Sequence, residues 1–472
     1  MSEPALSISN IRRKTVLSLL RTWRGIEGTA RHAIQSTIRP DLPKEDMVSL
    51  RQQMELCLDS PGGEVSERSN TADLGRSYLG LNEEGRTRFL QVLASDFDVD
   101  HNAIAAIGQQ LGTAQNDEER LAIEMELRQA LVSPRSVILK QFTALPEGFK
   151  FLVNMRADLL PLVNKDSKLK GLEHDLKAIL SAWFDVGLLD LVEVTWRSPA
   201  ALLEKLIEYE AVHRVASWDD LKNRLDADRR VFAFFHSKMP LDPLIFVHVA
   251  FTEGMSDNVQ VLLDQNSPLL DTQKADSAIF YSISNAQKGL AGISFGNFLI
   301  KRVVGLLTQE MPHIKTYATL SPIPGFRAWL DPLLKNTDES ILQPAEIAAL
   351  KKLGNSKNPT INFYEVLEQN WPEYKEIAAV LKPILMRLCA RYLLEEKRNG
   401  KPLDPVSNFH LFNGARLERM NWLGDISPKG MKQSAGLMVN YYYKLSEIDE
   451  NHENFATHGK IVASKQVKSY LD

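Results

Sequence analysis

The stretch FYSISNAQKGLAGISFGNFLIKRVVGLL, residues 280–307, combines three patterns that decide the fold of its part of the chain. Residues 280–284 are rich in aromatic and β-branched side chains, which predicts a strand. Glycines follow at positions 289, 292 and 296, and an apolar pattern at helical spacing runs from residue 298 to 307. The sequence therefore predicts a strand, a loop of exposed backbone amides and a helix.

This order of elements suits a ligand that carries phosphate. Glycines let the backbone approach a ligand closely, and the first amides of the following helix have no acceptor within the helix. The spacing fits neither a dinucleotide fingerprint nor a P-loop, because no Gly-Lys-Ser/Thr closes the loop. The pyrophosphate of coenzyme A fits better.

The length and charge of the chain limit its class. A chain of 472 residues is expected to form two domains. With 56 basic and 60 acidic residues the net charge is −4, which gives no overall field for attracting nucleic acid. No apolar run reaches the length of a membrane helix, and no secretory core is present. We therefore expect a soluble protein with neither a nucleic-acid nor a membrane partner.

Cysteines and the two ends of the chain bear on its compartment. Cys57 and Cys389 are the only cysteines and lie far apart, so they form no disulfide framework or zinc cluster and favour a reducing compartment. Residues 11–39 carry many arginines and one acid, Glu27, which is typical of a transit peptide or of an amphipathic helix of the folded domain. We favour the helix. The chain ends in Ser-Tyr-Leu-Asp and not in a peroxisomal Ser-Lys-Leu, so the cytoplasm is expected, with the mitochondrial matrix as the alternative.

The chain changes texture near residue 188. Residues 1–188 have helical periodicity, with Asn82 and Asn116 placed as helix N-caps, and predict a helical domain for packing or oligomerisation. Beyond it, residues 231–235 and 244–251 predict an antiparallel hairpin, and residues 278–284 and 316–321 two further strands. Residues 189–472 are therefore expected to form an α+β domain with a mixed sheet.

Two residues stand out as candidates for chemistry. Ser321 follows a strand and precedes Pro-Ile-Pro-Gly, so its hydroxyl is expected at a strand end where ligands gather. An ordinary turn explains the same residues equally well. His410 lies among apolar neighbours, where burial would keep its imidazole neutral, although a lone histidine of this kind is more often a core residue.

Other site types find little support. No pair of histidines and carboxylates has metal-ligand spacing, and no Gly-x-Ser-x-Gly elbow indicates an α/β-hydrolase. The tyrosines at 441–443 fit either a pocket wall or an aromatic face of the core.

Five segments together resemble the malonyl-CoA decarboxylase family, in the same order along the chain. They are residues 280–284, 296–304, 320–326, 408–415 and 436–441. The resemblance implies an α+β chain in which an all-α N-terminal domain precedes a catalytic domain related to the GNAT acyltransferases, with a mixed sheet that splays to admit the pantetheine arm. It also implies a homo-oligomer, a dimer or tetramer assembled partly through the helices.

The resemblance further assigns roles to single residues. Ser321 would be the catalytic serine, His410 the catalytic histidine, and Tyr443 a further pocket residue. Ser294 stands where relatives can carry a glutamate, which puts an acid role for that position in doubt. Coenzyme A would be held by Ala291, Gly292, Ile293, Ser294, Phe295, Gly296 and Asn297.

The reaction that the resemblance implies is the conversion of malonyl-CoA to acetyl-CoA and carbon dioxide through a thioester enolate. It needs no metal or organic cofactor, because hydrogen-bond donors can stabilise the enolate. We expect His410 to protonate the enolate and Ser321 to orient the substrate or the histidine, since an unactivated serine is a poor base. An acyltransferase on the same scaffold and a non-catalytic acyl-CoA sensor are the alternatives, and carbon dioxide release without an acceptor would separate them.

Overall fold

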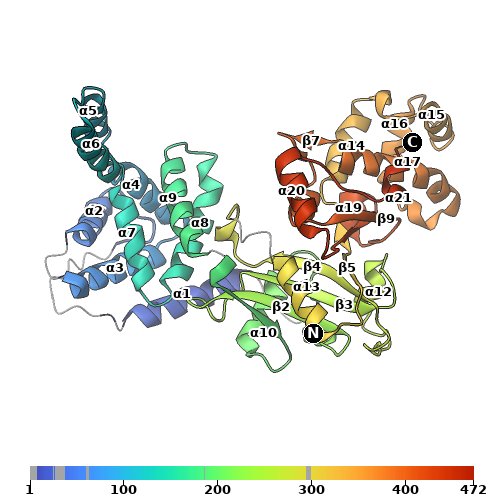
Figure 1. Cartoon of the computed structure of the whole chain (residues 1–472), viewed down its shortest axis with the longest axis horizontal. Coiled ribbons are helices and arrows are strands. Elements are labelled where there is room, and N and C mark those ends of the chain that lie inside the picture. The colour runs from blue at the N-terminus through green and yellow to red at the C-terminus, as the bar shows by residue number, and fades with distance from the viewer. Residues whose placement is uncertain are drawn as a thin grey trace. The chain divides into compact units, whose positions relative to one another are not determined.

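A computed structural model describes residues 8–24, 26, 38–59, 63–184, 186–293 and 299–471. The chain divides into two compact units (Figure 1). The first, the helical unit, comprises the chain up to Asp190, the turn Phe235–Leu244 and the glycine run from Ala286. The second, the sheet unit, comprises the rest. The glycine run is thus grouped by its packing with helices that precede it by more than a hundred residues.

Nine α-helices appear in the described part of the helical unit. Asn82 caps α4 by accepting from Gly85 N, and Asn116 caps α6 by accepting from Glu119 N, so both predicted caps are confirmed. Ser133 caps α7, with proline in the first turn of that helix. The helices are α1 (Ile8–Arg24), α2 (Asp46–Leu58), α3 (Gly63–Gly80), α4 (Glu83–Asp96), α5 (His101–Leu111), α6 (Asp117–Ala130), α7 (Pro134–Gln141), α8 (Gly148–Val163) and α9 (Leu169–Trp183).

An aromatic cluster forms the core of the helical unit. The ring of Phe151 in α8 lies edge-on to Trp23 of α1, with centroids 5.0 Å apart, and stacks on Phe142 at 4.6 Å. Gly75 of α3 carries no side chain at the point where Trp23 packs, and a Cβ there would lie 2.2 Å from the indole. Since Trp23 is fully buried, α1 belongs to this core, as the helix interpretation of the N-terminal segment requires. Residues 27–37 of that segment lie outside the described residues.

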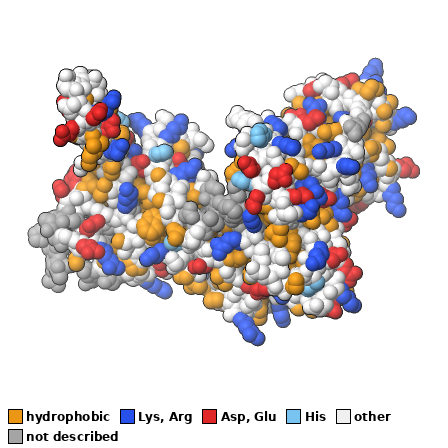
Figure 2. All heavy atoms as spheres, viewed as in Figure 1, with side chains coloured by type: hydrophobic (Ala, Val, Ile, Leu, Met, Phe, Trp, Pro, Cys, Tyr) orange, Lys and Arg blue, Asp and Glu red, His pale blue; other side chains and the backbone are white. Residues whose placement is uncertain are grey.

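Helices α5 and α6 form a hairpin at one edge of the helical unit (Figure 1). Large apolar side chains stay exposed on and just after it. They are Leu121, Met125, Leu131 and Val132. Hydrophobic atoms are visible along the flank of this hairpin in Figure 2.

The sheet unit is built on one eight-stranded sheet. Its strand order is β1-β2-β3-β4-β5-β10-β6, and β9 pairs with β10. β4 and β5 run parallel, while β10 is antiparallel to β5, β6 and β9. The strands are β1 (Leu189–Val194), β2 (Arg229–His236), β3 (Ile245–Thr252), β4 (Ser277–Asn285), β5 (Thr316–Thr319), β6 (Ser321–Pro322), β9 (Arg416–Asn421) and β10 (Met438–Tyr442).

The central strands β2, β3 and β4 are buried along nearly their whole length. Their sequences are nearly continuous apolar runs, as expected for strands that are covered on both faces. The hairpin predicted for β2 and β3 is confirmed as antiparallel. The helices are α10 (Ala200–Tyr209), α11 (Trp218–Arg224), α12 (Val259–Leu263), α13 (Leu299–Glu310), α14 (Phe326–Lys335), α15 (Pro344–Leu350), α16 (Pro359–Leu367), α17 (Lys375–Leu394), α18 (Pro405–Phe412), α19 (Pro428–Ser434), α20 (Ile448–His458) and α21 (Lys465–Lys468). A short ribbon joins β7 (Lys397–Arg398) to β8 (Lys401–Pro402).

The parallel pair β4 and β5 separates partway along its length. Its register runs from Ser277 opposite Thr316 to Phe280 opposite Thr319, and a last bond joins Leu320 N to Phe280 O. Beyond Phe280, β4 continues to Asn285 paired with β3. The strand expected over 316–321 breaks at Leu320, and Ser321 resumes pairing in β6, opposite Val439 of β10. Ser321 therefore lies at the point where the parallel strands part.

Among the described residues, no helix has both the length and the apolar character needed to cross a bilayer.

Candidate active site

Ser321 and His410 meet in the interior of the sheet unit. Ser321 Oγ lies 3.0 Å from His410 Nε2, and both side chains are buried. Ser321 comes from β6, whereas His410 comes from the last turn of α18, 89 residues further along the chain. The structure thus brings the two residues that the resemblance names into hydrogen-bonding contact.

A buried carboxylate fixes the histidine helix to the serine segment. Asp404 caps α18, and its Oδ1 accepts from Val406 N and Ser407 N. Its Oδ2 accepts from Gly325 N, four residues after Ser321. Burial raises the pKa of Asp404 above its usual value. One side chain therefore sets both the start of the histidine helix and the path of the chain beyond the serine.

Gly325 is constrained at the same place. A Cβ at this position would lie 2.1 Å from the Tyr392 hydroxyl, which itself contacts Asp404 at 3.4 Å. The glycine of the Ser-Pro-Ile-Pro-Gly segment is thus required by close packing rather than by an unusual backbone angle.

Two tyrosines enclose the imidazole. The Tyr443 hydroxyl lies 2.7 Å from His410 Nδ1, and the Tyr441 ring stacks on the imidazole with centroids 4.5 Å apart. Tyr443 was expected as a pocket residue, but its hydroxyl is engaged on the side of the imidazole away from Ser321. Its contacts make it a partner of the histidine.

The cluster is electrically neutral. Burial alone lowers the pKa of His410 to about 3, so the imidazole carries no charge near neutral pH. Burial also raises the pKa values of Tyr441 and Tyr443 well above their usual range. Any proton that leaves this site therefore comes from a neutral donor.

Thr319, at the end of β5, completes the cluster. Ser321 Oγ donates a hydrogen bond to Thr319 Oγ1 at 2.8 Å, and Tyr441 N donates to the same oxygen at 3.1 Å. Neither Thr319 nor Asp404 was identified from the sequence. A local pattern could have found Asp404, because aspartate followed by proline is typical of the N-cap and first residue of a helix. Thr319 had no such pattern, since its role depends on which strand lies opposite.

The glycine run is held by side chains of the helical unit. Arg156 of α8 donates from Nη1 to the carbonyls of Gly289 and Ala291, and its Nη2 bonds Glu173. A Cβ on Gly289 would lie 1.7 Å from Val153 O, so only glycine lets the run approach α8.

Ahead of the gap in the described chain, Gly292 has a φ of +71°, the left-handed region that favours glycine. The ammonium of Lys177 in α9 lies 3.8 Å from where a Cβ on Gly292 would be. Ala291 is exposed and Ile293 is buried. The predicted coenzyme A residues Ser294, Phe295, Gly296 and Asn297 lie outside the described residues.

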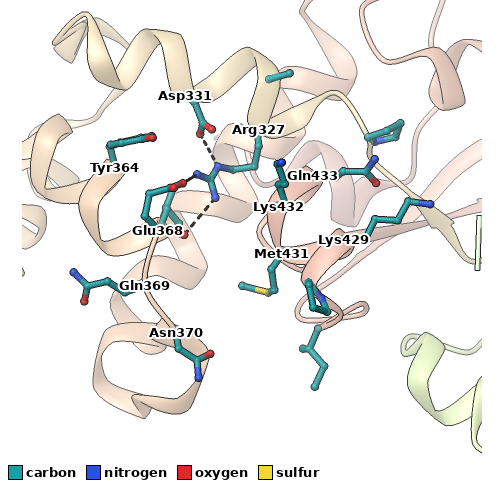
Figure 3. A pocket seen from close by; sticks show the side chains of 15 residues that line it. Arg327, Asp331, Tyr364, Glu368, Gln369, Asn370, Lys429, Met431, Lys432 and Gln433 are labelled. Atoms are coloured by element: carbon teal, nitrogen blue, oxygen red, sulfur yellow. Dashed lines mark hydrogen bonds and ion pairs between the residues drawn. The ribbon is translucent and has the colours of Figure 1, made fainter. Parts of the chain in front are cut away.

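A separate cleft of about 950 Å³ opens between α14, α16 and α19 (Figure 3). Arg327 lies at its centre and bonds Asp331 at 2.5 Å and Glu368 at 2.7 Å, so its charge is already balanced. Pro324 lines the cleft, but Ser321 and His410 do not. The pair with Asp331 lies within α14, and the pair with Glu368 joins α14 to the end of α16.

No group of three or more histidine, cysteine, aspartate or glutamate side chains is placed to hold a metal ion in the part of the chain that the structure describes.

Comparison with known proteins gives the same family for both parts of the chain. The profile of the malonyl-CoA decarboxylase C-terminal domain matches residues 187–472, and that of the N-terminal domain matches residues 97–184. The mitochondrial malonyl-CoA decarboxylase of Rattus norvegicus is 39% identical over 424 residues, covering 85% of each chain. That of Mus musculus is 36% identical and covers 94% of this chain and 92% of its own.

Solved structures agree with the sequence matches. The malonyl-CoA decarboxylase of Rhodopseudomonas palustris superposes with a TM-score of 0.81 at 39% identity, covering 89% of this chain and 99% of its own. That of Agrobacterium vitis gives 0.81 at 38% identity, covering 90% and 100%. The chain therefore belongs to the malonyl-CoA decarboxylase family of carboxy-lyases.

Proposed function

We propose that this chain converts malonyl-CoA to acetyl-CoA and carbon dioxide at the Ser321–His410 pair. The observation that carries the proposal is the 3.0 Å contact between these buried side chains, which come from separate elements. Hydrogen-bond donors in a buried site can stabilise the charge of an enolate, and the exclusion of water protects this reactive intermediate.

In the proposed mechanism, the bond between Cα and the carboxylate carbon breaks and its electron pair stays on Cα. Carbon dioxide leaves, and the charge spreads onto the thioester oxygen as an enolate. Hydrogen-bond donors aimed at that oxygen can each lower such a barrier by ~3–4 kcal/mol. The electron pair then takes a proton to form the methyl group of acetyl-CoA, so one proton is consumed in each turnover.

His410 is the proposed proton donor. With its pKa lowered to about 3, the imidazole is neutral, and its transferable proton is the ring N–H. A thioester carbanion is basic enough to take a proton from a neutral donor. Solvent finally restores the proton at Nε2, while the Tyr443 hydroxyl stays hydrogen-bonded to Nδ1.

Ser321 is proposed to orient the substrate or the histidine. The only base that it contacts is the His410 imidazole, and a pKa lowered to about 3 makes that imidazole too weak a base to remove the serine proton. This mechanism uses only side-chain and backbone groups, and we propose that no metal or organic cofactor takes part.

Residues 291–297, which begin within the glycine run, are proposed to bind the pyrophosphate of coenzyme A. Support comes from the positive φ of Gly292 and from the nearby Lys177 ammonium. The parting of β4 from β5 supports the GNAT relationship, since a pantetheine arm needs a gap between parallel strands.

We also propose a homo-oligomer, a dimer or a tetramer. The exposed apolar residues of the α5–α6 hairpin offer a surface that a second copy could bury, and Met125 is 61% exposed. Light scattering of the variant with Leu121→Glu and Met125→Glu should give a smaller particle than the parent. An unchanged mass would exclude this surface.

The cellular compartment remains a choice between cytoplasm and mitochondrial matrix. The animal relatives are named as mitochondrial. Because α1 contributes Trp23 to the core, we propose that it is retained in the folded protein and that the cytoplasm is the site of action. Fractionation of cells that express the chain with a C-terminal tag would test this.

The central experiment is carbon dioxide release from malonyl-CoA by the purified protein in the absence of any acyl acceptor. Stoichiometric carbon dioxide and acetyl-CoA are expected, with loss of activity in Ser321→Ala. Binding without release would indicate a sensor, and release only with an amine or alcohol acceptor would indicate an acyltransferase.

A further inference from the structure

Thr319 lies in hydrogen-bonding contact with the Ser321 hydroxyl. The Thr319 side chain is fully buried at the break between β5 and β6, beside Tyr441 of β10. The Tyr441 amide donates a hydrogen bond to Thr319 Oγ1 at 3.1 Å. The threonine oxygen thus has a fixed donor on one side and Ser321 on the other.

The direction of the serine bond follows from the geometry. Ser321 donates its single hydroxyl proton to Thr319 Oγ1 at 2.8 Å. That proton cannot at the same time bond His410 Nε2, which lies 3.0 Å from the same serine oxygen. For the second contact to be a hydrogen bond, His410 has to carry its proton on Nε2 and donate it to Ser321.

The far side of the ring fits the same arrangement. With a proton on Nε2, the neutral imidazole has an acceptor at Nδ1, where the Tyr443 hydroxyl lies at 2.7 Å. The Tyr443 proton then has an acceptor, and three hydrogen bonds run in one direction from Tyr443 through His410 and Ser321 to Thr319.

We propose that Thr319 is a positioning residue that holds His410 in the tautomer with its proton on Nε2, the face that contacts Ser321. The proposal rests on the proposed function, in which His410 gives this proton to the enolate. Without the threonine acceptor, the Ser321 proton turns to Nε2, the histidine proton moves to Nδ1, and the ring presents a lone pair where the substrate needs an acid. No bond to the substrate is made by Thr319 itself.

The tautomer can be measured in the free enzyme by solid-state NMR of protein labelled with ¹⁵N at histidine Nε2. Subtracting the spectrum of His410→Gln isolates the His410 signal. A protonated Nε2 is expected in the wild type. An unprotonated Nε2 would overturn the proposal whatever the activity, and this result does not depend on any Thr319 variant folding.

Thr319→Val and Thr319→Ser form the matched pair. Valine keeps the shape but removes the acceptor, so we expect the His410 signal to move toward the unprotonated form. We expect kcat to fall by ~10-fold or more, up to the ~10⁴-fold loss that a fully wrong tautomer causes in a serine protease triad. The KM for malonyl-CoA should change by less than threefold. Serine should restore both the signal and most of kcat.

The outcomes distinguish the positioning role of Thr319 from the proposed decarboxylase function. A Thr319→Val variant with an unchanged tautomer would overturn the positioning role even if kcat falls, because the loss would then be structural. If the tautomer shifts as expected but wild-type protein releases no carbon dioxide, the positioning role stands and the proposed function fails.

Discussion

The Ser321–His410 cluster and the glycine run use opposite chemistry to hold their residues. Ser321, His410 and Tyr443 are buried and joined by hydrogen bonds between neutral groups. The glycine run is fixed by a charged side chain, Arg156, that also forms an ion pair with Glu173. Neutral surroundings keep a proton donor ready for an enolate, whereas a charged scaffold suits a loop that is to receive a dianionic pyrophosphate. The comparison predicts that damage to the first region changes turnover and damage to the second changes binding.

The largest effect is expected from His410→Ala. Loss of the proposed donor should lower kcat by about a hundredfold or more, on the scale of lost acid catalysis, while coenzyme A still binds with nearly its original affinity. Steady-state carbon dioxide release and calorimetric titration with coenzyme A measure the two quantities. Wild-type turnover in this variant would show that His410 is not the proton donor and that this cluster does not control turnover.

Acid should destabilise the fold through the same residue. The pKa of His410 in the folded protein is about 3, below the ordinary value of 6.5. Between these two values the imidazole binds a proton in the unfolded chain but stays neutral in the folded protein. The stability present above pH 6.5 is therefore lost as the pH falls, by about 2 kcal/mol at pH 5.

Urea unfolding at pH 7 and pH 5 measures this loss. The difference should be smaller in His410→Gln by the same amount. The matched control is His452→Gln, which changes a histidine at a more exposed position. An equal acid sensitivity in wild type and His410→Gln would mean that the cluster does not exclude the charged imidazole.

A binding effect is expected from Arg156→Lys. Lysine keeps the charge beside Glu173 but cannot bridge two carbonyls as a guanidinium does, so the glycine run should lose its fixed path. We expect the KM for malonyl-CoA to rise by ~10-fold with little change in kcat.

Arg135→Lys is the control for this substitution. Arg135 is another buried arginine of the helical unit, bonded to Asp175 and to the Ala94 carbonyl and not to the glycine run. A fall in kcat at constant KM in Arg156→Lys would contradict the division of labour proposed here.

The smallest effect is expected from Lys177→Ala. This ammonium has no hydrogen-bond or ion-pair partner among the described residues and lies next to Gly292. Loss of an exposed contact to phosphate should weaken coenzyme A binding by about threefold at low salt and less at high salt. Titration with coenzyme A and with pantetheine, which carries no phosphate, would show whether the effect needs the pyrophosphate. Equal weakening for both ligands would place Lys177 elsewhere in the site.

The sequence predicted elements better than contacts. The hairpin of β2 and β3 and the caps at Asn82 and Asn116 depend on neighbouring residues, and the structure confirms them. The contact between Ser321 and His410 depends on where β10 and α18 pack, and no local pattern encodes that. The residues alone made each a candidate, and the resemblance assigned them together as the catalytic serine and histidine.

The finer parts of the site were beyond prediction for a related reason. Thr319 acquires its role because the Tyr441 amide of β10 lies beside it, and β5 and β10 are more than a hundred residues apart in the chain. The single strand predicted over residues 316–321 was wrong at Leu320, where the structure divides it into β5 and β6. Asp404 is the exception, since its capping function is local.

The bare Cα of Gly289, pressed against the Val153 carbonyl, makes the sequence of the loop and that of α8 depend on each other. Adding one methyl group on the loop side, or shifting α8 by a fraction of its width, would force the loop and the helix apart. Chimeras that exchange helical segments between relatives should therefore work only when the donor and the recipient agree at this junction. An exchange that ignores this junction should fail because the space for a single carbon atom is missing.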